Sequence, residues 1–276
     1  MEFQFTKMHG LGNDFVVIDA ISQQINLSAE QIRAISDRHF GVGCDQLLLV
    51  EKPTDERAEF RYRIFNGDGI EVEQCGNGAR CFAMFVRQQA LTTNDIIPVE
   101  TAGGLIELKV EGDQVTVNIG VPNFDPKSLP FNVEKQAETY NLMVNGVEYA
   151  IGAVSVGNPH AVMIVDNIEN IDIEDLGKAI ESHPLFPKRV NAGFMQIING
   201  DEIRLRVYER GVGETQACGT GACAAVAVGR KLGKLNEKVT AKLHGGNLTI
   251  NWPGEGQTLL MKGPATTVFQ GQFNCE

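Results

Sequence analysis

The sequence predicts a mixed α/β protein of two related halves, in each of which many short strands surround a buried helix. Its 276 residues are 43% hydrophobic and are enough for about two domains. Short β-branched or alternating segments outnumber helical ones, and a Cys-Gly-x-Gly-Ala motif occurs twice. Ordinary glycine, proline and aromatic contents argue against a disordered or low-complexity chain.

The predicted strands share a short length and an alternating or β-branched pattern, with Gly or Asn-Gly between several of them. They are residues 14–19, 45–50, 60–65, 106–111, 115–119, 161–165, 194–198, 203–208, 238–243 and 247–252.

Four helices are predicted, and they are of two kinds. Ser28 can form a capping box with Gln31 at the start of an amphipathic helix, and 173–182 is its counterpart in the second half. The other two, 79–89 and 222–232, each follow a Cys-Gly-x-Gly element. The second of these begins with residues that are small or apolar on every face, which is typical of a helix surrounded by protein.

An internal repeat aligns Cys75 with Cys218. The match extends upstream without a gap, so duplication is favoured over chance recurrence of a short motif. With a two-residue slip it continues to the Gly-Asn pair that precedes a strand in each half. The matched pairs are 75–79 with 218–222, 61–66 with 204–209, Glu71 with Glu214, and Gly12-Asn13 with Gly157-Asn158.

Composition and charge limit the partners. The net charge is −11 and no local basic patch is present, so we expect neither a nucleic acid nor an anionic membrane surface as partner. The uncharged stretch 215–229 is too short to span a bilayer, and the N-terminus does not resemble a secretory signal. We therefore expect a soluble, cytoplasmic protein with free thiols that binds a small molecule.

Cys75 and Cys218 are the candidate catalytic residues. A helix N-terminus stabilises a thiolate and can lower the pKa of its thiol, while the free N–H groups of the following residues can hold a carboxylate. If the halves are related by a pseudo-twofold axis, the two cysteines face each other. Two acid/base groups on opposite faces of a carbon are what stereoinversion next to a carboxylate requires. The alternative is that both are small buried hydrophobes.

Other functions remain open on the residues alone. One cysteine paired with His160 could perform acyl transfer, although two equivalent cysteines fit that reaction poorly. A non-catalytic amino-acid-binding module could use the same residues. The cysteine and histidine spacings do not indicate a metal site, and the glycine-rich elements lack the signatures of nucleotide-binding loops. We therefore expect no metal and no cofactor, and we expect Cys44, Cys81, Cys223 and Cys275 to have no catalytic role.

Several motifs together resemble the diaminopimelate epimerase family over almost the whole chain. Proline-racemase-like relatives share the paired cysteines but not these flanking residues. The motifs are His9-Gly-Leu-Gly-Asn-Asp-Phe15, Asn66-Gly-Asp-Gly69, Cys75-Gly-Asn-Gly-Ala-Arg-Cys81, Gly157-Asn-Pro-His160, Tyr208-Glu-Arg-Gly-Val-Gly-Glu-Thr215 and Ala217-Cys-Gly-Thr-Gly-Ala222.

The resemblance implies a cofactor-independent isomerase that interconverts LL- and meso-2,6-diaminopimelate on the bacterial route to lysine and peptidoglycan. Epimerisation of another amino acid is the alternative. The resemblance also implies a homodimer. It implies two domains, each a mostly antiparallel, barrel-like sheet around a central helix, with the site in the cleft between them. The first would comprise residues 1–119 plus 265–276 and carry Cys75, and the second residues 120–264 with Cys218.

The resemblance assigns roles residue by residue. Cys75 would accept the proton in the LL-to-meso direction and Cys218 would donate one, with His160 and Glu209 tuning the thiol pKa values. Amide side chains suit a substrate that is a zwitterion at both ends, and Arg210 suits its distal carboxylate. The implied substrate contacts are Asn13, Gln46, Asn66, Gly76, Asn77, Asn158, Asn191, Glu209, Arg210, Gly219 and Thr220.

Overall fold

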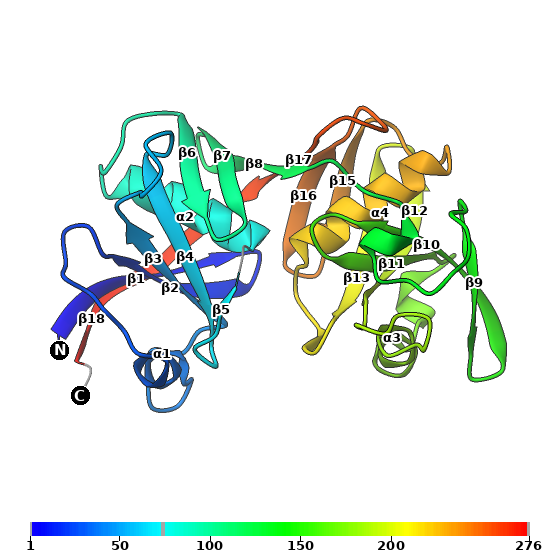
Figure 1. Cartoon of the computed structure of the whole chain (residues 1–276), viewed down its shortest axis with the longest axis horizontal. Coiled ribbons are helices and arrows are strands. Elements are labelled where there is room, and N and C mark those ends of the chain that lie inside the picture. The colour runs from blue at the N-terminus through cyan, green and yellow to red at the C-terminus, as the bar shows by residue number, and fades with distance from the viewer. Residues whose placement is uncertain (1, 73–74, 275–276) are drawn as a thin grey trace. The chain divides into compact units, whose positions relative to one another are not determined.

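The computed structural model describes residues 2–72 and 75–274, and the chain divides into two compact units (Figure 1). Unit 1 comprises Met1–Asn118 and Lys262–Glu276, and unit 2 comprises Ile119–Met261. The chain therefore leaves unit 1, forms the whole of unit 2, and returns to complete unit 1.

In the described residues, unit 1 contains two helices and a mostly antiparallel sheet. Strands β2 and β3 are parallel, as are β4 and β6, while β1 pairs antiparallel with both β2 and β18. The elements are β1 (Glu2–Gly10), β2 (Asn13–Asp19), α1 (Ala29–Ser36), β3 (Gln46–Glu51), β4 (Phe60–Asn66), β5 (Glu71–Val72), α2 (Gly76–Gln88), β6 (Ile96–Thr101), β7 (Gly104–Glu111), β8 (Gln114–Gly120), whose last two residues begin unit 2, and β18 (Thr266–Asn274).

Unit 2 repeats this order of elements. The parallel pairings are again two, β11 with β12 and β13 with β15. The elements are a 3-10 turn (Pro126–Ser128), β9 (Tyr140–Val144), β10 (Val147–Ser155), β11 (Pro159–Ile164), a second 3-10 turn (Ile168–Asn170), α3 (Ile173–Glu181), β12 (Asn191–Asn199), β13 (Glu202–Glu209), β14 (Gly213–Glu214), α4 (Gly219–Lys231), β15 (Lys238–Leu243), β16 (Gly246–Asn251) and β17 (Leu259–Pro264), which ends in unit 1.

One ion pair recurs in both units at the positions that the repeat aligns. In unit 1 the guanidinium of Arg63 forms a fork with the carboxylate of Glu71, with N–O distances of 2.9 and 2.8 Å. In unit 2 Arg206 and Glu214 form the same fork at 2.7 and 2.8 Å. Each fork joins a long strand to the next, short strand along the chain: β4 to β5 in unit 1, and β13 to β14 in unit 2. Both strands precede the motif cysteine. The duplication inferred from the sequence is thus visible in side-chain geometry.

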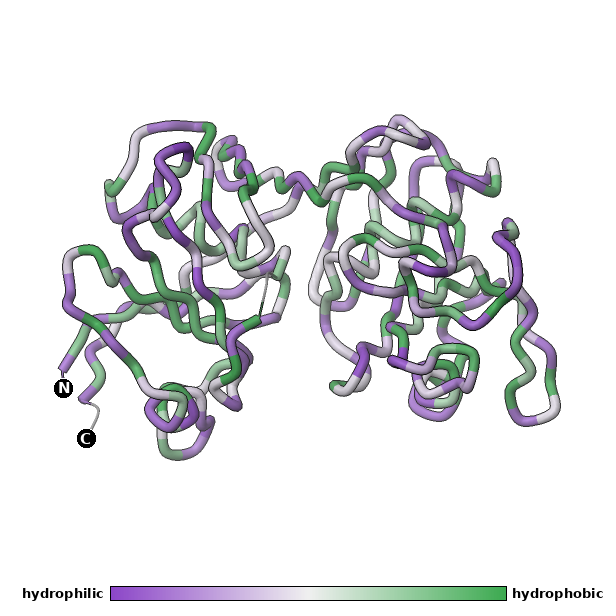
Figure 2. Tube along the Cα trace, viewed as in Figure 1, coloured by the Kyte–Doolittle hydropathy of each residue, from purple (hydrophilic) through white to green (hydrophobic). Residues whose placement is uncertain are grey.

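Each unit has one helix at its centre. Helix α2 packs against β1, β2, β3 and β7 and buries residues 77–86, while α4 packs against β10, β11, β12, β13, β15 and β16 and buries nearly every residue up to Gly229 (Figure 1). Figure 2 shows hydrophobic stretches of the trace passing through the strands inside each unit. The prediction of short strands around buried helices is confirmed.

The outer helices begin with side-chain caps. Ser28 and Gln31 form the predicted capping box at the start of α1. The side chain of Asp172 accepts the backbone N–H of Asp175 at the start of α3. Helices α2 and α4 instead begin after Cys75 and Cys218, whose side chains make no capping hydrogen bond.

Sequence patterns located every predicted strand to within three residues at each end and missed several other strands. Strand β6 contains Pro98, β10 contains Gly152, and β18 has no buried residue, so none has a typical strand signature. Helices α2 and α4 each begin three residues earlier than predicted, because their first turns contain the glycines of the motif.

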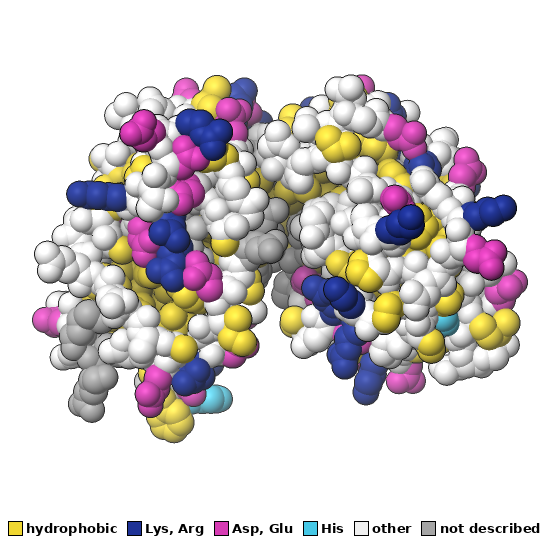
Figure 3. Space-filling view, in the orientation of Figure 1, with side chains coloured by type: hydrophobic (Ala, Val, Ile, Leu, Met, Phe, Trp, Pro, Cys, Tyr) yellow, Lys and Arg dark blue, Asp and Glu magenta, His cyan; other side chains and the backbone are white. Residues whose placement is uncertain are grey.

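Charged side chains on the viewed surface are mixed in sign. Figure 3 shows basic and acidic side chains next to one another on both units. On β4, the carboxylates of Glu51, Glu71 and Glu100 are within 4.0 Å of Arg61 or Arg63. Within residues 2–72 and 75–274, none of the helices has both the length and the apolar character needed to cross a membrane.

The contact between Gly152 in β10 and Val228 in α4 gives a stability prediction. A β-carbon on residue 152 would lie 2.3 Å from a methyl group of Val228, so we expect Gly152→Ala to lower the free energy of unfolding by about 1–3 kcal/mol. Trp252, the single tryptophan, is buried in unit 2, so its fluorescence in urea reports on that unit. In a Val228→Ala background the cost should shrink, and an unchanged cost would contradict the contact.

Candidate functional site

In unit 1 the predicted site residues lie where several elements begin or end. Asn13 is the first residue of β2, Gln46 the first of β3 and Asn66 the last of β4, while Gly76 and Asn77 open α2. Since β2 and β3 are parallel and β4 runs against β3, these ends lie at one edge of the sheet. The topology therefore gathers residues that are far apart in the sequence.

Cys75 precedes α2 in an extended conformation and is partly buried. Its thiol donates a hydrogen bond to Oδ1 of Asn13, with the sulfur and oxygen 3.7 Å apart. The same oxygen accepts a hydrogen bond from Nδ2 of Asn77 at 3.2 Å. The thiol is therefore in contact with one predicted substrate-binding amide, Asn13, which is bonded to a second, Asn77.

Gln46 and Asn66 face each other across β3 and β4, and Nε2 of Gln46 donates to Oδ1 of Asn66 at 2.8 Å. This pair and the Cys75 contacts bring together five of the side chains predicted for unit 1. Gly76 contributes its backbone at the first position of the helix.

Two residues that the sequence analysis did not single out support Cys75. The hydroxyl of Tyr62 donates to the Cys75 carbonyl at 3.4 Å, and burial raises the pKa of Tyr62 well above its ordinary value. Arg80 is completely buried and donates from Nη2 to Oδ1 of Asn77 at 2.9 Å. Arg80 lies inside the Cys-Gly-Asn-Gly-Ala-Arg motif, so its position in the motif could have identified it.

In unit 2 the corresponding cysteine, Cys218, is buried and lies before α4. Its sulfur is 3.7 Å from Oγ1 of Thr220, which accepts a hydrogen bond from Nδ2 of Asn158 at 3.3 Å. Burial raises the pKa of Cys218 well above its ordinary value, and the carboxylate of Glu209 raises it further through its charge and a hydrogen bond. Residue 218 is therefore a thiol in this structure.

The raised pKa of Cys218 differs from the expectation that a helix N-terminus lowers it. The helix N-terminus is present, and a backbone hydrogen bond from Gly221 acts in the expected direction. Removal of the thiol from water and the nearby negative charge outweigh it.

His160 is a neutral imidazole. It is completely buried, and burial, with a smaller contribution from the charge of Arg210, lowers its pKa to about 3. Its Nε2 is hydrogen-bonded to Oδ1 of Asn158 at 2.9 Å, whereas its Nδ1 is buried with no hydrogen-bond partner in the described part of the chain. The histidine thus contacts an amide that reaches Thr220, next to Cys218.

The remaining site residues of unit 2 are held at the ends of β12 and β13. Glu209 accepts a short hydrogen bond from the hydroxyl of Thr215, with an oxygen–oxygen distance of 2.6 Å. Asn191 accepts the backbone N–H of Arg210 at 2.9 Å, which fixes the start of the loop, while the Arg210 side chain is exposed. Gly219 opens α4 as Gly76 opens α2.

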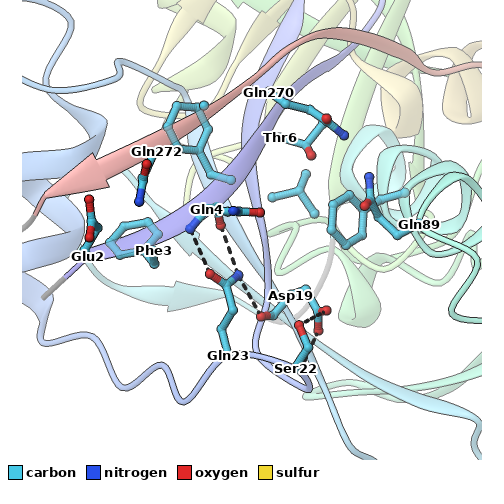
Figure 4. Close-up of a pocket in the computed structure, with 14 residues that line it drawn as sticks. Glu2, Phe3, Gln4, Thr6, Asp19, Ser22, Gln23, Gln89, Gln270 and Gln272 are labelled. Carbon is cyan, nitrogen blue, oxygen red and sulfur yellow. Dashed lines mark hydrogen bonds between the residues drawn. The ribbon is translucent and has the colours of Figure 1, made fainter.

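A different cavity lies at the far end of α2 from Cys75. It has a volume of about 750 Å³ and is rich in glutamine (Figure 4). Gln23 crosses it and pairs with the backbone of Gln4 in both directions, at 2.8 and 3.1 Å. Phe85 of α2 and Gln89, directly after that helix, line it, and none of the predicted site residues does.

Three of the four cysteines with no predicted catalytic role, Cys44, Cys81 and Cys223, are buried, and Cys275 lies outside the described residues. Within the described ranges, the histidine, cysteine and carboxylate side chains form no group of three that could hold a metal ion.

The fold is shared with solved epimerase structures. A hydroxyproline epimerase from Agrobacterium vitis, with bound trans-4-hydroxy-L-proline, matches with a TM-score of 0.72 at 15% identity, over 98% of this chain and 92% of that one. At that identity the similarity concerns the fold alone.

Sequence comparison is more specific. The diaminopimelate epimerase family model matches residues 5–124 and 152–268. The diaminopimelate epimerase of Thioalkalivibrio sulfidiphilus is 60% identical, over 99% of this chain and 100% of its own. That of Teredinibacter turnerae is 57% identical over 99% of both chains. The chain belongs to the diaminopimelate epimerase family, as its motifs predicted, and members of this family are isomerases.

The buried state of His160 gives a pH prediction. Its pKa is about 3 in the folded protein and about 6.5 when unfolded, so below pH 6.5 the unfolded chain binds more protons. His160 therefore adds stability above pH 6.5 that is lost as the pH falls toward 3. The unfolding free energy should therefore fall as the pH is lowered below 6.5. We expect His160→Gln to reduce the slope of this fall by roughly 1 kcal/mol per pH unit.

Urea unfolding followed by Trp252 fluorescence between about pH 7 and 4.5 measures this slope. His183→Gln, which alters a partly exposed histidine of the same unit, is the control and should keep the wild-type slope. Equal slopes for wild type and His160→Gln would contradict a buried neutral histidine.

Proposed function

We propose that this protein interconverts LL- and meso-2,6-diaminopimelate without a cofactor, using Cys75 and Cys218 as a thiolate base and a thiol acid. The observation that carries the proposal is that each repeat places a cysteine directly before the first turn of its buried central helix. Membership of the diaminopimelate epimerase family supports the choice of substrate.

In the LL-to-meso direction the Cys75 thiolate removes the α-proton, so the Cα–H bond breaks and an S–H bond forms. Asn13 is placed to accept a hydrogen bond from that new S–H. The carbanion takes a proton from the Cys218 thiol on the opposite face, and this leaves a thiolate there. The raised pKa of Cys218 keeps it protonated until that step, and the reverse direction exchanges the two roles.

The helix starts supply the groups that would bind the reacting carboxylate. The first N–H groups of a helix have no partner within it, and here neither Cys75 nor Cys218 caps them with its side chain. The N–H groups at Gly76-Asn77 and Gly219-Thr220 can therefore stabilise the negative charge that develops on the carboxylate. The exposed guanidinium of Arg210 would pair with the distal carboxylate.

The amide side chains complete the binding set. Asn13, Gln46 and Asn66 of unit 1, with Asn158 and Asn191 of unit 2, can donate to carboxylates and accept from ammonium groups. We propose Glu209 and His160 as tuning residues, because Glu209 raises the pKa of Cys218 and His160 bonds to Asn158. The homodimer and the cytoplasmic location stay predictions.

Acyl transfer by a Cys–His pair is less well supported. Nε2 of His160 is hydrogen-bonded to Asn158 and not to a cysteine sulfur, and a pKa of about 3 makes this imidazole a weak base for activating a thiol.

The proposal is tested by proton NMR of the protein with LL-diaminopimelate in D2O. We expect deuterium to enter the α-position together with formation of the meso product. Cys75→Ser and Cys218→Ser should each lower stereoinversion at least about 100-fold, because a serine hydroxyl is a far weaker acid and base under these conditions. Cys44→Ala, at a buried thiol outside both motifs, is the control and should remain active.

Two results would contradict the proposal. Wild-type protein that binds the substrate without exchange or inversion would favour the binding-module alternative. A serine variant of Cys75 or Cys218 that retains full stereoinversion would exclude that residue as an acid/base group.

A further inference from the structure

Asn13 accepts a hydrogen bond from the Cys75 thiol, and its amide nitrogen is also bonded to a carboxylate. Its Nδ2 donates to Oδ2 of Asp45 at 2.9 Å. A carboxylate can only accept hydrogen bonds, so the amide must turn its nitrogen to Asp45 and its oxygen to Cys75. The other Asp45 oxygen accepts from Arg38 at 2.6 Å, which holds the carboxylate in place.

The opposite end of this chain of hydrogen bonds is also fixed. Arg80 can only donate, and it donates to Oδ1 of Asn77. The nitrogen of Asn77 must therefore point to Oδ1 of Asn13. Gly10 permits this close packing, since a β-carbon there would lie 3.0 Å from Nη2 of Arg80. Both amides are thus oriented by charged groups at the two ends.

We infer that Asp45 is a positioning residue, which with Arg80 fixes the amide of Asn13 so that its oxygen faces the Cys75 sulfur. This arrangement stabilises the thiol of Cys75 over the thiolate, because an oxygen acceptor bonds to S–H and repels S⁻. The reversed amide would present N–H to the sulfur and stabilise the thiolate. The inference deepens the proposed function and rests on it only for its effect on turnover.

Unit 2 lacks this arrangement. The corresponding amide, Asn158, lies between His160 and Thr220, each of which can donate or accept. Among the hydrogen bonds of the described residues, Asn158 itself is not bonded to an ionised side chain, so its amide is not oriented by a charge as that of Asn13 is. An amide whose orientation is fixed by a charged side chain is therefore a feature of unit 1, which carries Cys75.

Other titratable groups near Cys75 could also influence its pKa. Arg80 is buried beneath the start of the helix, and Tyr62 and Cys81 interact electrostatically with Cys75. A change at residue 45 removes none of these groups. The Asp45 side chain is 44% exposed, so replacing it leaves the core intact.

The test is the pH dependence of Cys75 alkylation by iodoacetamide. Trypsin cleaves after Arg63 and Arg80, so Cys75 is the one cysteine in the peptide 64–80 and can be followed by mass spectrometry. We expect Asp45→Asn to move the midpoint for Cys75 down by about 0.5–1 pH unit, because the released amide can present its N–H to the sulfur. Asp45→Ser provides a second variant with the same expectation.

Loss of the Asp45 charge alone would also favour the thiolate, so the measurement is repeated in an Asn13→Ala background. We expect the effect of Asp45→Asn to disappear there, because Asp45 acts through the amide. An equal shift in both backgrounds, or no shift in a folded Asp45→Asn protein, would overturn the inference.

The alkylation result does not depend on turnover. A shift that requires Asn13, in a protein that fails to epimerise diaminopimelate, would uphold the positioning role and overturn the proposed function. If both hold, we expect Asp45→Asn to lower kcat about 10-fold while KM changes less than about 3-fold, since the proton-transfer step is affected more than binding.

Discussion

Burial of one helix in each unit, with the first turn left free of a side-chain cap, is the constraint on which the rest of the structure depends. A buried helix start must find partners for its N–H groups, and most helices use Ser, Thr, Asp or Asn for this purpose. Helices α1 and α3 do so, whereas α2 and α4 begin after cysteines. The strand ends around each cysteine carry amides, and in the proposed function the first N–H groups of each helix bind the substrate carboxylate.

Local sequence patterns were sufficient for the elements with strong signatures. The Ser28 capping box and the Cys-Gly-x-Gly elements depend on residues close in sequence, and the structure contains helices at all of them. The α/β fold class and the family are confirmed as well. Strand β18 could not be identified this way, because it exists through pairing with β1, which is far away in the sequence. The assignment of catalytic and binding roles stays a prediction.

The electrostatics of the site were less accessible from sequence, because they depend on tertiary contacts. The helix that begins directly after Cys218 indicates a lowered pKa for its thiol, but burial and Glu209 reverse the direction. Asp45 bonds to Asn13, which is 32 residues away in the sequence, so no spacing rule predicts this contact. Duplication thus preserved the backbone around the two cysteines, while side chains at equivalent positions made their surroundings chemically different.

The pairing of β1 with β18 also bears on the order in which the protein can fold during synthesis. Glu2 pairs with Asn274, so the first strand of the chain waits for the last strand before its edge is covered. Unit 2 is one continuous stretch and has all its residues once Met261 has left the ribosome. Translation therefore allows the second unit to close while the first still has an open sheet edge, the reverse of the usual N-terminal-first order.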